Sequence, residues 1–195
     1  MSVSQYVSTP VSPPAVPTAD AHVVQFYTDD SYLITSLRQF VRSALQAREA
    51  VILVMTREHQ RALQQALRTA RIDTDGASEE GRFYSLDAVE TLGKFSSGKG
   101  VINRGQFQNV IGSLIRETEK KTPGKRVYVF GEMVAVLWAE GLNDAALQLE
   151  QLWNELATTH HFYLRCAYPA SGFHGALKGE PYTAICAEHS KIIPA

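Results

Sequence analysis

The chain has 195 residues, of which 45% are hydrophobic and 20% are charged, and its formal net charge is -1. These values are typical of one globular domain, and no apolar run approaches the ~18 residues that a membrane span requires. The near-neutral charge gives no positive field for a polyanion, so we predict neither a membrane protein nor a direct partner of nucleic acid.

The first 20 residues are rich in proline and serine and lack the cationic start and apolar core of a secretory signal. They predict a disordered leader (1–20) before a single folded domain (21–195). Short apolar runs predict five strands, at 22–27, 50–55, 82–86, 126–130 and 162–168. Helical spacing predicts helices at 32–47, 57–71, 87–95, 105–121, 131–141, 145–160 and 181–189.

Several of these helices are preceded by a side chain that can cap the N-terminus. The expected caps are Asp29 or Asp30, Thr56, Asp87 with Glu90 three residues on, Glu132, and Asn143 or Asp144. The alternation of strands and helices predicts an α/β fold with three layers, in which a mostly parallel sheet of about five or more strands carries helices on both faces. Ligands of such sheets bind beyond the carboxyl ends of the strands, and we therefore expect the site at that edge.

The stretch "GKFSSGKG", Gly93 to Gly100, matches seven of the eight positions of a Walker A phosphate loop. The eighth position needs a Ser or Thr hydroxyl for Mg²⁺, and the chain has Gly100 there. A phosphate loop must also leave a strand and enter a helix, whereas this loop leaves a predicted helix. We interpret the match as a coincidence.

Seven segments taken together resemble the MEDS domain, a sensory domain of bacterial and archaeal signalling proteins. They are "HVVQFYTDD", "VILVMTREHQRAL", "DAVETLGKF", "FGEMVAVLWAEG", "AALQLEQLWNEL", "CAYP" and "ICAEHSKIIP", and they cover roughly residues 20 to 194. The resemblance implies a RecA/KaiC-like core without a Walker A loop and without a cofactor. It also implies a sensor of small hydrocarbon derivatives that acts through a histidine kinase or a transcription or anti-sigma regulator.

The first strand and turn, "VVQFYTDDS", stand where a related ATPase would carry its glycine-rich loop. Glycine and lysine are absent there, and Asp29 and Asp30 would repel a triphosphate. The resemblance therefore implies a cleft that receives something smaller than a nucleotide.

Eight residues are predicted to form the ligand site: His22, Gln25, Tyr27, Asp29, Asp30, His59, Glu132 and Tyr168. Strand alternation, with His22 and Tyr27 only approximately in step, is expected to place His22, Gln25 and Tyr27 on one face as a polar wall. The alternative is that His22 and Gln25 satisfy buried backbone groups.

The other candidates also have two interpretations. Asp29 and Asp30 cap a helix first and contact ligand second. His59 lies one turn into a helix, where its ring either overhangs the sheet edge or faces solvent. Glu132 follows the fourth strand, where related ATPases use acidic residues on water and metal, although its plain role is a helix cap. Tyr168 is placed to line the mouth of a small apolar pocket.

No metal site and no catalytic thiol are predicted. Cys166 and Cys186 lie in apolar stretches without metal-type spacing, which suits buried thiols in a reducing cytoplasm. His160 and His161 are adjacent and cannot face one site together, and His189 is expected to interact with the carbonyl end of the last helix.

Three functions remain open from the sequence. The first is a non-enzymatic sensor that binds a small, apolar ligand and signals through a partner protein, with a homodimer among the expected assemblies. The second is an enzyme that retains nucleotide chemistry. The third is an interaction module that binds nothing small.

Overall fold

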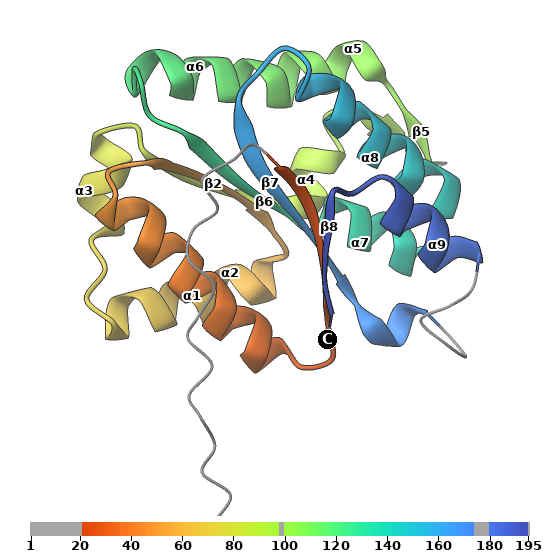
Figure 1. Ribbon diagram of the computed structural model, residues 1–195, viewed down its shortest axis with the longest axis horizontal. Helices are drawn as coiled ribbons and strands as arrows, with labels where there is room; N and C mark the ends of the chain where they lie inside the picture. Colours follow the sequence, from red (N-terminus) through yellow and green to blue (C-terminus); the bar gives the residue numbers. More distant parts are fainter. Residues whose placement is uncertain (1–20, 98–99, 174–179, 195) are drawn as a thin grey trace, which may run out of the picture.

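The computed structural model describes residues 21–97, 100–173 and 180–194, and the predicted leader lies outside this part (Figure 1). A six-stranded sheet with the order β3-β2-β6-β7-β1-β8 forms its centre, and all neighbouring strands pair in parallel. The strands are β1 (Ala21–Tyr27), β2 (Ala50–Met55), β3 (Phe83–Asp87), β6 (Val127–Gly131), β7 (Phe162–Pro169) and β8 (Lys191–Ile193). The expected parallel sheet is confirmed. β8 had no counterpart in the prediction, because three residues are too few to show a period.

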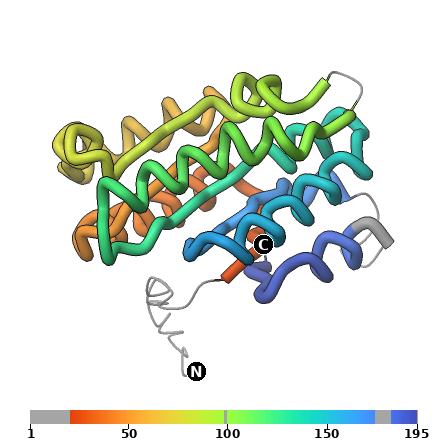
Figure 2. The backbone as a smooth tube through the Cα atoms, turned by 90° about the horizontal axis from the view of Figure 1, so that it is seen from above, coloured from red at the N-terminus to blue at the C-terminus, as the bar shows by residue number. Residues whose placement is uncertain are grey.

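Helices cover both faces of the sheet, as predicted (Figures 1 and 2). One face carries α1 (Asp30–Gln46) and α2 (Arg57–Thr69), with α3 (Thr74–Glu79) beside them. The opposite face carries α4 (Ala88–Leu92), α5 (Arg104–Phe107), the π-helical segment η1 (Gln108–Gly112), α6 (Ser113–Lys121), α7 (Met133–Ala139), α8 (Asn143–Leu156) and α9 (Glu180–Ala187). A 3-10 turn, η2 (Ala170–Gly172), follows β7.

Two apolar cores lie on the two sides of the sheet, and strand alternation divides the side chains between them. The core on the α1 side includes Val23 and Tyr27, and the core on the α8 side includes Val24 and Phe26. We call these sides the α1 face and the α8 face. All residues of β2 and β6 are buried, as expected for strands covered on both faces.

The predicted helix caps are partly confirmed. Asp29 accepts hydrogen bonds from the Ser31 and Tyr32 amides, while Thr56 caps α2 and Asp87 caps α4. The cap predicted for α8 is wrong, because the helix already begins at Asn143 and its N-cap residue Leu142 offers no polar side chain.

The stretch from Gly93 to Gly100 follows helix α4, as expected from the sequence. It contains β4 (Ser96–Ser97), which pairs antiparallel with β5 (Val101–Ile102). Residues 98 and 99 lie outside the described part of the chain. The element that follows the stretch is a strand rather than the helix N-terminus that a phosphate loop requires.

Candidate functional site

Four of the predicted site residues meet at the carboxyl edge of the sheet, near the crevice between β2 and β6. They are Tyr27, Asp30, His59 and Glu132. The helices after these neighbouring strands lie on opposite faces, which makes this a topological switch point. Glu132, only 1% exposed, bridges the crevice. Its carboxylate accepts the Thr56 amide at 2.8 Å and lies 2.6 Å from Nδ1 of His59.

The other ring nitrogen of His59 extends the same network to the first helix. Its Nε2 lies 3.4 Å from Oδ1 of Asp30, which is an exposed side chain. The ring of Tyr27 meets the His59 ring edge to face, with centroids 6.1 Å apart. The loops after β1, β2 and β6 are therefore joined by one chain of polar contacts.

The buried Glu132 carboxylate changes the pKa values of the side chains around it. The hydrogen bond that His59 donates to Glu132 is the main reason that the pKa of His59 is raised, against the opposing effect of burial. Burial raises the pKa of Tyr27, and the charges of Glu132 and Asp30 add to that increase. The expectation that the Glu132 side chain caps α7 is wrong, because its oxygens contact the Thr56 amide and the His59 ring at the start of α2 instead.

His22 does not share a face with Gln25 and Tyr27, so that expectation is wrong. Alternation places His22 with Val24 on the α8 face, whereas Gln25 points to the α1 face. There the Gln25 side-chain oxygen accepts a hydrogen bond of 3.4 Å from Arg165.

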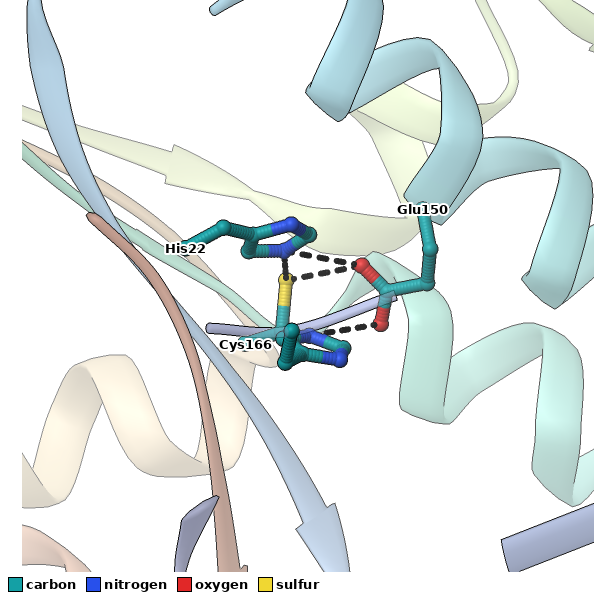
Figure 3. A group of neighbouring side chains, drawn as sticks. His22, Glu150 and Cys166 are labelled. Carbon is teal, nitrogen blue, oxygen red and sulfur yellow. Dashed lines mark hydrogen bonds and ion pairs between the residues drawn. The ribbon is translucent and has the colours of Figure 1, made fainter. Parts of the chain in front are cut away.

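A second polar cluster surrounds His22 inside the α8 face (Figure 3). Its Nε2 lies 3.2 Å from Oε2 of Glu150 and 3.4 Å from Sγ of Cys166. Sγ of Cys166 is itself 3.2 Å from the same carboxylate oxygen. β1, α8 and β7 thus each contribute one side chain to a single point.

Two further residues complete this cluster. The Tyr168 hydroxyl donates to Oε1 of Glu150 at 2.8 Å, and Nε2 of His189 lies 3.5 Å from that oxygen. The His22 and His189 rings lie 4.0 Å apart between centroids. Tyr168 is fully buried, where it also contacts the Phe26 and Trp138 rings, so it does not reach the surface.

Burial and charge set the protonation preferences of this cluster. Burial alone would raise the pKa of Glu150, but the hydrogen bond from His22 and the charge of His189 hold it below its usual value. Burial and the charge of Glu150 raise the pKa of the Cys166 thiol well above its usual value. Such a thiol is a poor nucleophile by itself.

A cavity of about 500 Å³ opens beside the second cluster, at the start of β1 and β7. Its apolar walls are Ala21, Trp153, Ala157, Phe162, Leu164 and Ala187, and its polar groups are His22, Asn154, Glu188, His189 and Ser190. We call it the His22 cavity. Apolar walls with a few convergent polar groups are typical of small-molecule sites.

Another cavity, of about 420 Å³, lies on the α1 face among β2, β3, α2 and α3. It contains none of the eight predicted site residues. Its polar lining comes from helix surface residues such as Gln60, Arg61 and Asp75. The His22 cavity is the one that adjoins a buried cluster of ionisable groups.

Sequence reasoning missed Glu150, Asn154 and His189 as parts of a site. The signal for Glu150 was its position in the apolar stripe of α8, four residues after Ala146 and three before Trp153. His189 was expected only to meet the end of a helix, and its Nδ1 does contact the Ile185 carbonyl at 2.7 Å.

Comparisons with known proteins agree with this architecture. Within the described residues, no helix has the length and apolar character needed to span a membrane. The fold is similar to that of a KaiC-like protein from the hyperthermophilic archaeon Pyrococcus horikoshii, with a TM-score of 0.60 and 15% identity over 89% of this chain and 71% of that chain. No curated protein matches the sequence significantly. The family model of the methanogen/methylotroph, DcmR sensory domain matches residues 21–180, and the chain therefore belongs to the MEDS family.

Proposed function

We propose that this chain is a non-enzymatic sensor domain that takes a small, largely apolar molecule into the His22 cavity and reports its presence to a partner protein. The observation that carries the proposal is the cavity itself, about 500 Å³ in volume and walled by Trp153, Phe162 and Leu164. A site of this size and composition holds a small organic molecule with one or two polar anchors. Glu188 and Ser190, which also line the cavity and keep unused lone pairs, provide those anchors.

A route from ligand to signal follows from the elements that build the cavity. Its walls come from β1, α8, β7 and the segment from Ala187 to Ser190 between α9 and β8. A ligand that contacts all four elements favours the arrangement in which they are closest together. A histidine kinase or a transcription or anti-sigma regulator would then recognise the changed position of α8 and α9.

The test uses a panel of dichloromethane, butanol and phenol, which differ in size and polarity. A ligand at ten times its Kd stabilises the folded state by about 1.4 kcal/mol, which raises Tm by roughly 3–6 °C for a chain of this size. Differential scanning fluorimetry measures the shift. We expect at least one compound of the panel to produce it.

A blocked cavity separates this effect from general solvent effects. Ala157→Trp places a large ring at the exposed rim of the cavity and should abolish the shift. Ala47→Trp is the matched control, because Ala47 is also an exposed alanine directly after a helix, on the α1 side. Equal shifts in the two variants would contradict the cavity as the ligand site.

The carboxyl edge is the second candidate position for the ligand, as the sequence predicted. The observation in its favour is the contact of 3.4 Å between His59 and the exposed Asp30, which a polar ligand can replace. If the edge is the site, His59→Ala abolishes the Tm shift and Ala157→Trp leaves it intact. The opposite pattern assigns the ligand to the His22 cavity.

A further inference from the structure

Four metal-binding side chains converge next to the His22 cavity with the spacing of a metal's first coordination shell. The ligand atoms of His22, Glu150, Cys166 and His189 all lie within 4.8 Å of one another. A tetrahedral ion with bonds of about 2.0–2.3 Å holds its donor atoms roughly 3.3–3.8 Å apart. The ligand atoms of His22, Glu150 and Cys166 lie 3.2, 3.4 and 3.2 Å apart, which is close to this spacing, and Nε2 of His189 lies 3.5 Å from the other oxygen of Glu150.

The outward hydrogen bonds of both histidines leave Nε2 free to bind a cation. Nδ1 of His189 contacts the Ile185 carbonyl, which only accepts, so this nitrogen carries the proton. Nδ1 of His22 lies 2.8 Å from the Asn154 amide oxygen, and the Asn154 amide nitrogen donates to Glu188. In their neutral forms both imidazoles therefore direct a bare Nε2 toward Cys166 and Glu150, and a cation can take the place of the proton that Nε2 of His22 otherwise shares with Glu150.

The cluster contains more acceptors than donors. The His189 side chain is fully enclosed, and its Nε2 makes no hydrogen bond there. The Cys166 thiol has one proton to share between His22 and Glu150. An unpaired buried lone pair is costly, and a bound cation would satisfy it together with the other three donors.

We propose that His22, Glu150, Cys166 and His189 bind a divalent transition-metal ion, with Zn²⁺ as the ion that fits best. Two imidazole nitrogens, a thiolate and a carboxylate oxygen form a donor set that zinc accepts in tetrahedral geometry. Binding releases the Cys166 thiol proton to solvent, and the negative charges of the Cys166 thiolate and Glu150 neutralise the dication, so the complete site has no net charge in the core.

The surroundings provide the other features of a metal site. Tyr168 donates to Oε1 of Glu150, which leaves Oε2 for the ion, while Asn154 and the Ile185 carbonyl orient the imidazoles. The His22 cavity gives the ion a path of entry, since His22 and His189 both line it. Four protein ligands make a closed site, which ties β1, α8, β7 and the segment after α9 together.

The direct test is a titration of the chelator-treated protein with Co²⁺, which takes zinc's place and reports its ligands by absorption. We expect one equivalent to bind, with intense tetrahedral ligand-field bands and a thiolate-to-cobalt charge-transfer band. One equivalent of Zn²⁺ should then displace the cobalt and remove both signals. Absence of a stoichiometric complex in the wild-type protein would overturn the proposal.

Three variants test the thiolate ligand and the orientation of His22. Cys166→Ser should lose the charge-transfer band, and Cys186→Ser, which changes the other cysteine, should keep it. Asn154→Ala removes the hydrogen-bond partner of His22, together with the hydrogen bonds to Glu188, and should weaken Co²⁺ affinity about 10–100-fold. A charge-transfer band that persists in Cys166→Ser but disappears in Cys186→Ser would contradict the site.

The metal site goes beyond the sensor proposal and is tested separately from it. Ala157→Trp should abolish the Tm shift caused by the organic panel and leave the cobalt spectrum at equilibrium unchanged, because Ala157 is not a ligand of the ion and a narrower entrance slows uptake without changing affinity. If the wild-type protein shows the Tm shift with the organic panel but binds no cobalt, the metal site is wrong and the ligand cavity is not. If it binds cobalt but shows no Tm shift with any compound, the ligand cavity is wrong and the metal site is not.

Discussion

Glu150 is a carboxylate in the apolar stripe of α8, with none of its side chain exposed. A buried carboxylate is stabilised only when hydrogen bonds and opposite charges replace its hydration. Tyr168, Cys166 and His22 provide those contacts from β7 and β1. Its presence in the core is therefore explained by the residues of other elements that it meets, and by the ion that we propose they bind.

At the same scale, His59 should make stability depend on pH. Its folded-state pKa lies above the unfolded value of about 6.5, so the stability it contributes is complete below about pH 6.5 and is lost as pH rises through the folded-state pKa. Denaturant unfolding of the wild type and His59→Gln should show the largest difference near pH 6 and a smaller one near pH 9.

A variant of Asp30, the second carboxylate beside His59, gives the control for this pH dependence. Glu132 is the main cause of the raised pKa of His59, and Asp30 contributes less. Asp30→Asn should therefore retain most of the pH dependence. A difference between wild type and His59→Gln that grows with rising pH would contradict the role of the His59–Glu132 pair.

At the scale of elements, α8 connects the apolar core to the proposed ligand and metal sites. Its buried stripe includes Leu149, which is fully enclosed, whereas the neighbouring Gln148 is exposed. Leu149→Ala should lower the free energy of unfolding by about 2–5 kcal/mol, because it leaves a cavity in a packed core. Gln148→Ala should change it by less than about 0.5 kcal/mol. Urea unfolding measures both, and equal losses would contradict the orientation of α8.

Local sequence patterns predicted most of the strands and helices, but not the irregular hydrogen bonding inside one of them. Apolar runs located β1, β2, β3, β6 and β7 to within a residue or two, and helical spacing located α1, α2 and α8. The helix predicted at 105–121 is interrupted by η1, a change in hydrogen bonding that apolar spacing does not reveal.

The candidate sites were only partly predictable for a related reason. Tyr27, Asp30, His59 and Glu132 were expected at one place because each lies at or just after the end of a strand, and the structure brings them together since the carboxyl ends of parallel strands share one edge. The second cluster joins His22 to Cys166 across 144 positions and forms at the opposite end of β1, away from that edge. No local pattern specifies such a pairing, although a charged residue in the stripe of α8 was a signal.

At the scale of the whole molecule, the fold is shared with a KaiC-like protein, but the turn after β1 differs from a phosphate loop. No glycine occurs between Ala21 and Ala47, and the N-terminus of α1 carries the side chains of Asp29 and Asp30. Since these carboxylates repel phosphate, MgATP should leave Tm unchanged in scanning fluorimetry. Micromolar stabilisation by MgATP would favour the nucleotide enzyme instead.

The central claim is that a small molecule enters the His22 cavity, and amide chemical shifts of isotope-labelled protein test it most directly. During titration with dichloromethane, butanol and phenol, we predict shifts in the stretches that line the cavity, 21–22, 153–157 and 187–190. Shifts confined to Asp30, His59 and Glu132 at the carboxyl edge, or none with any of the three compounds, would contradict the account.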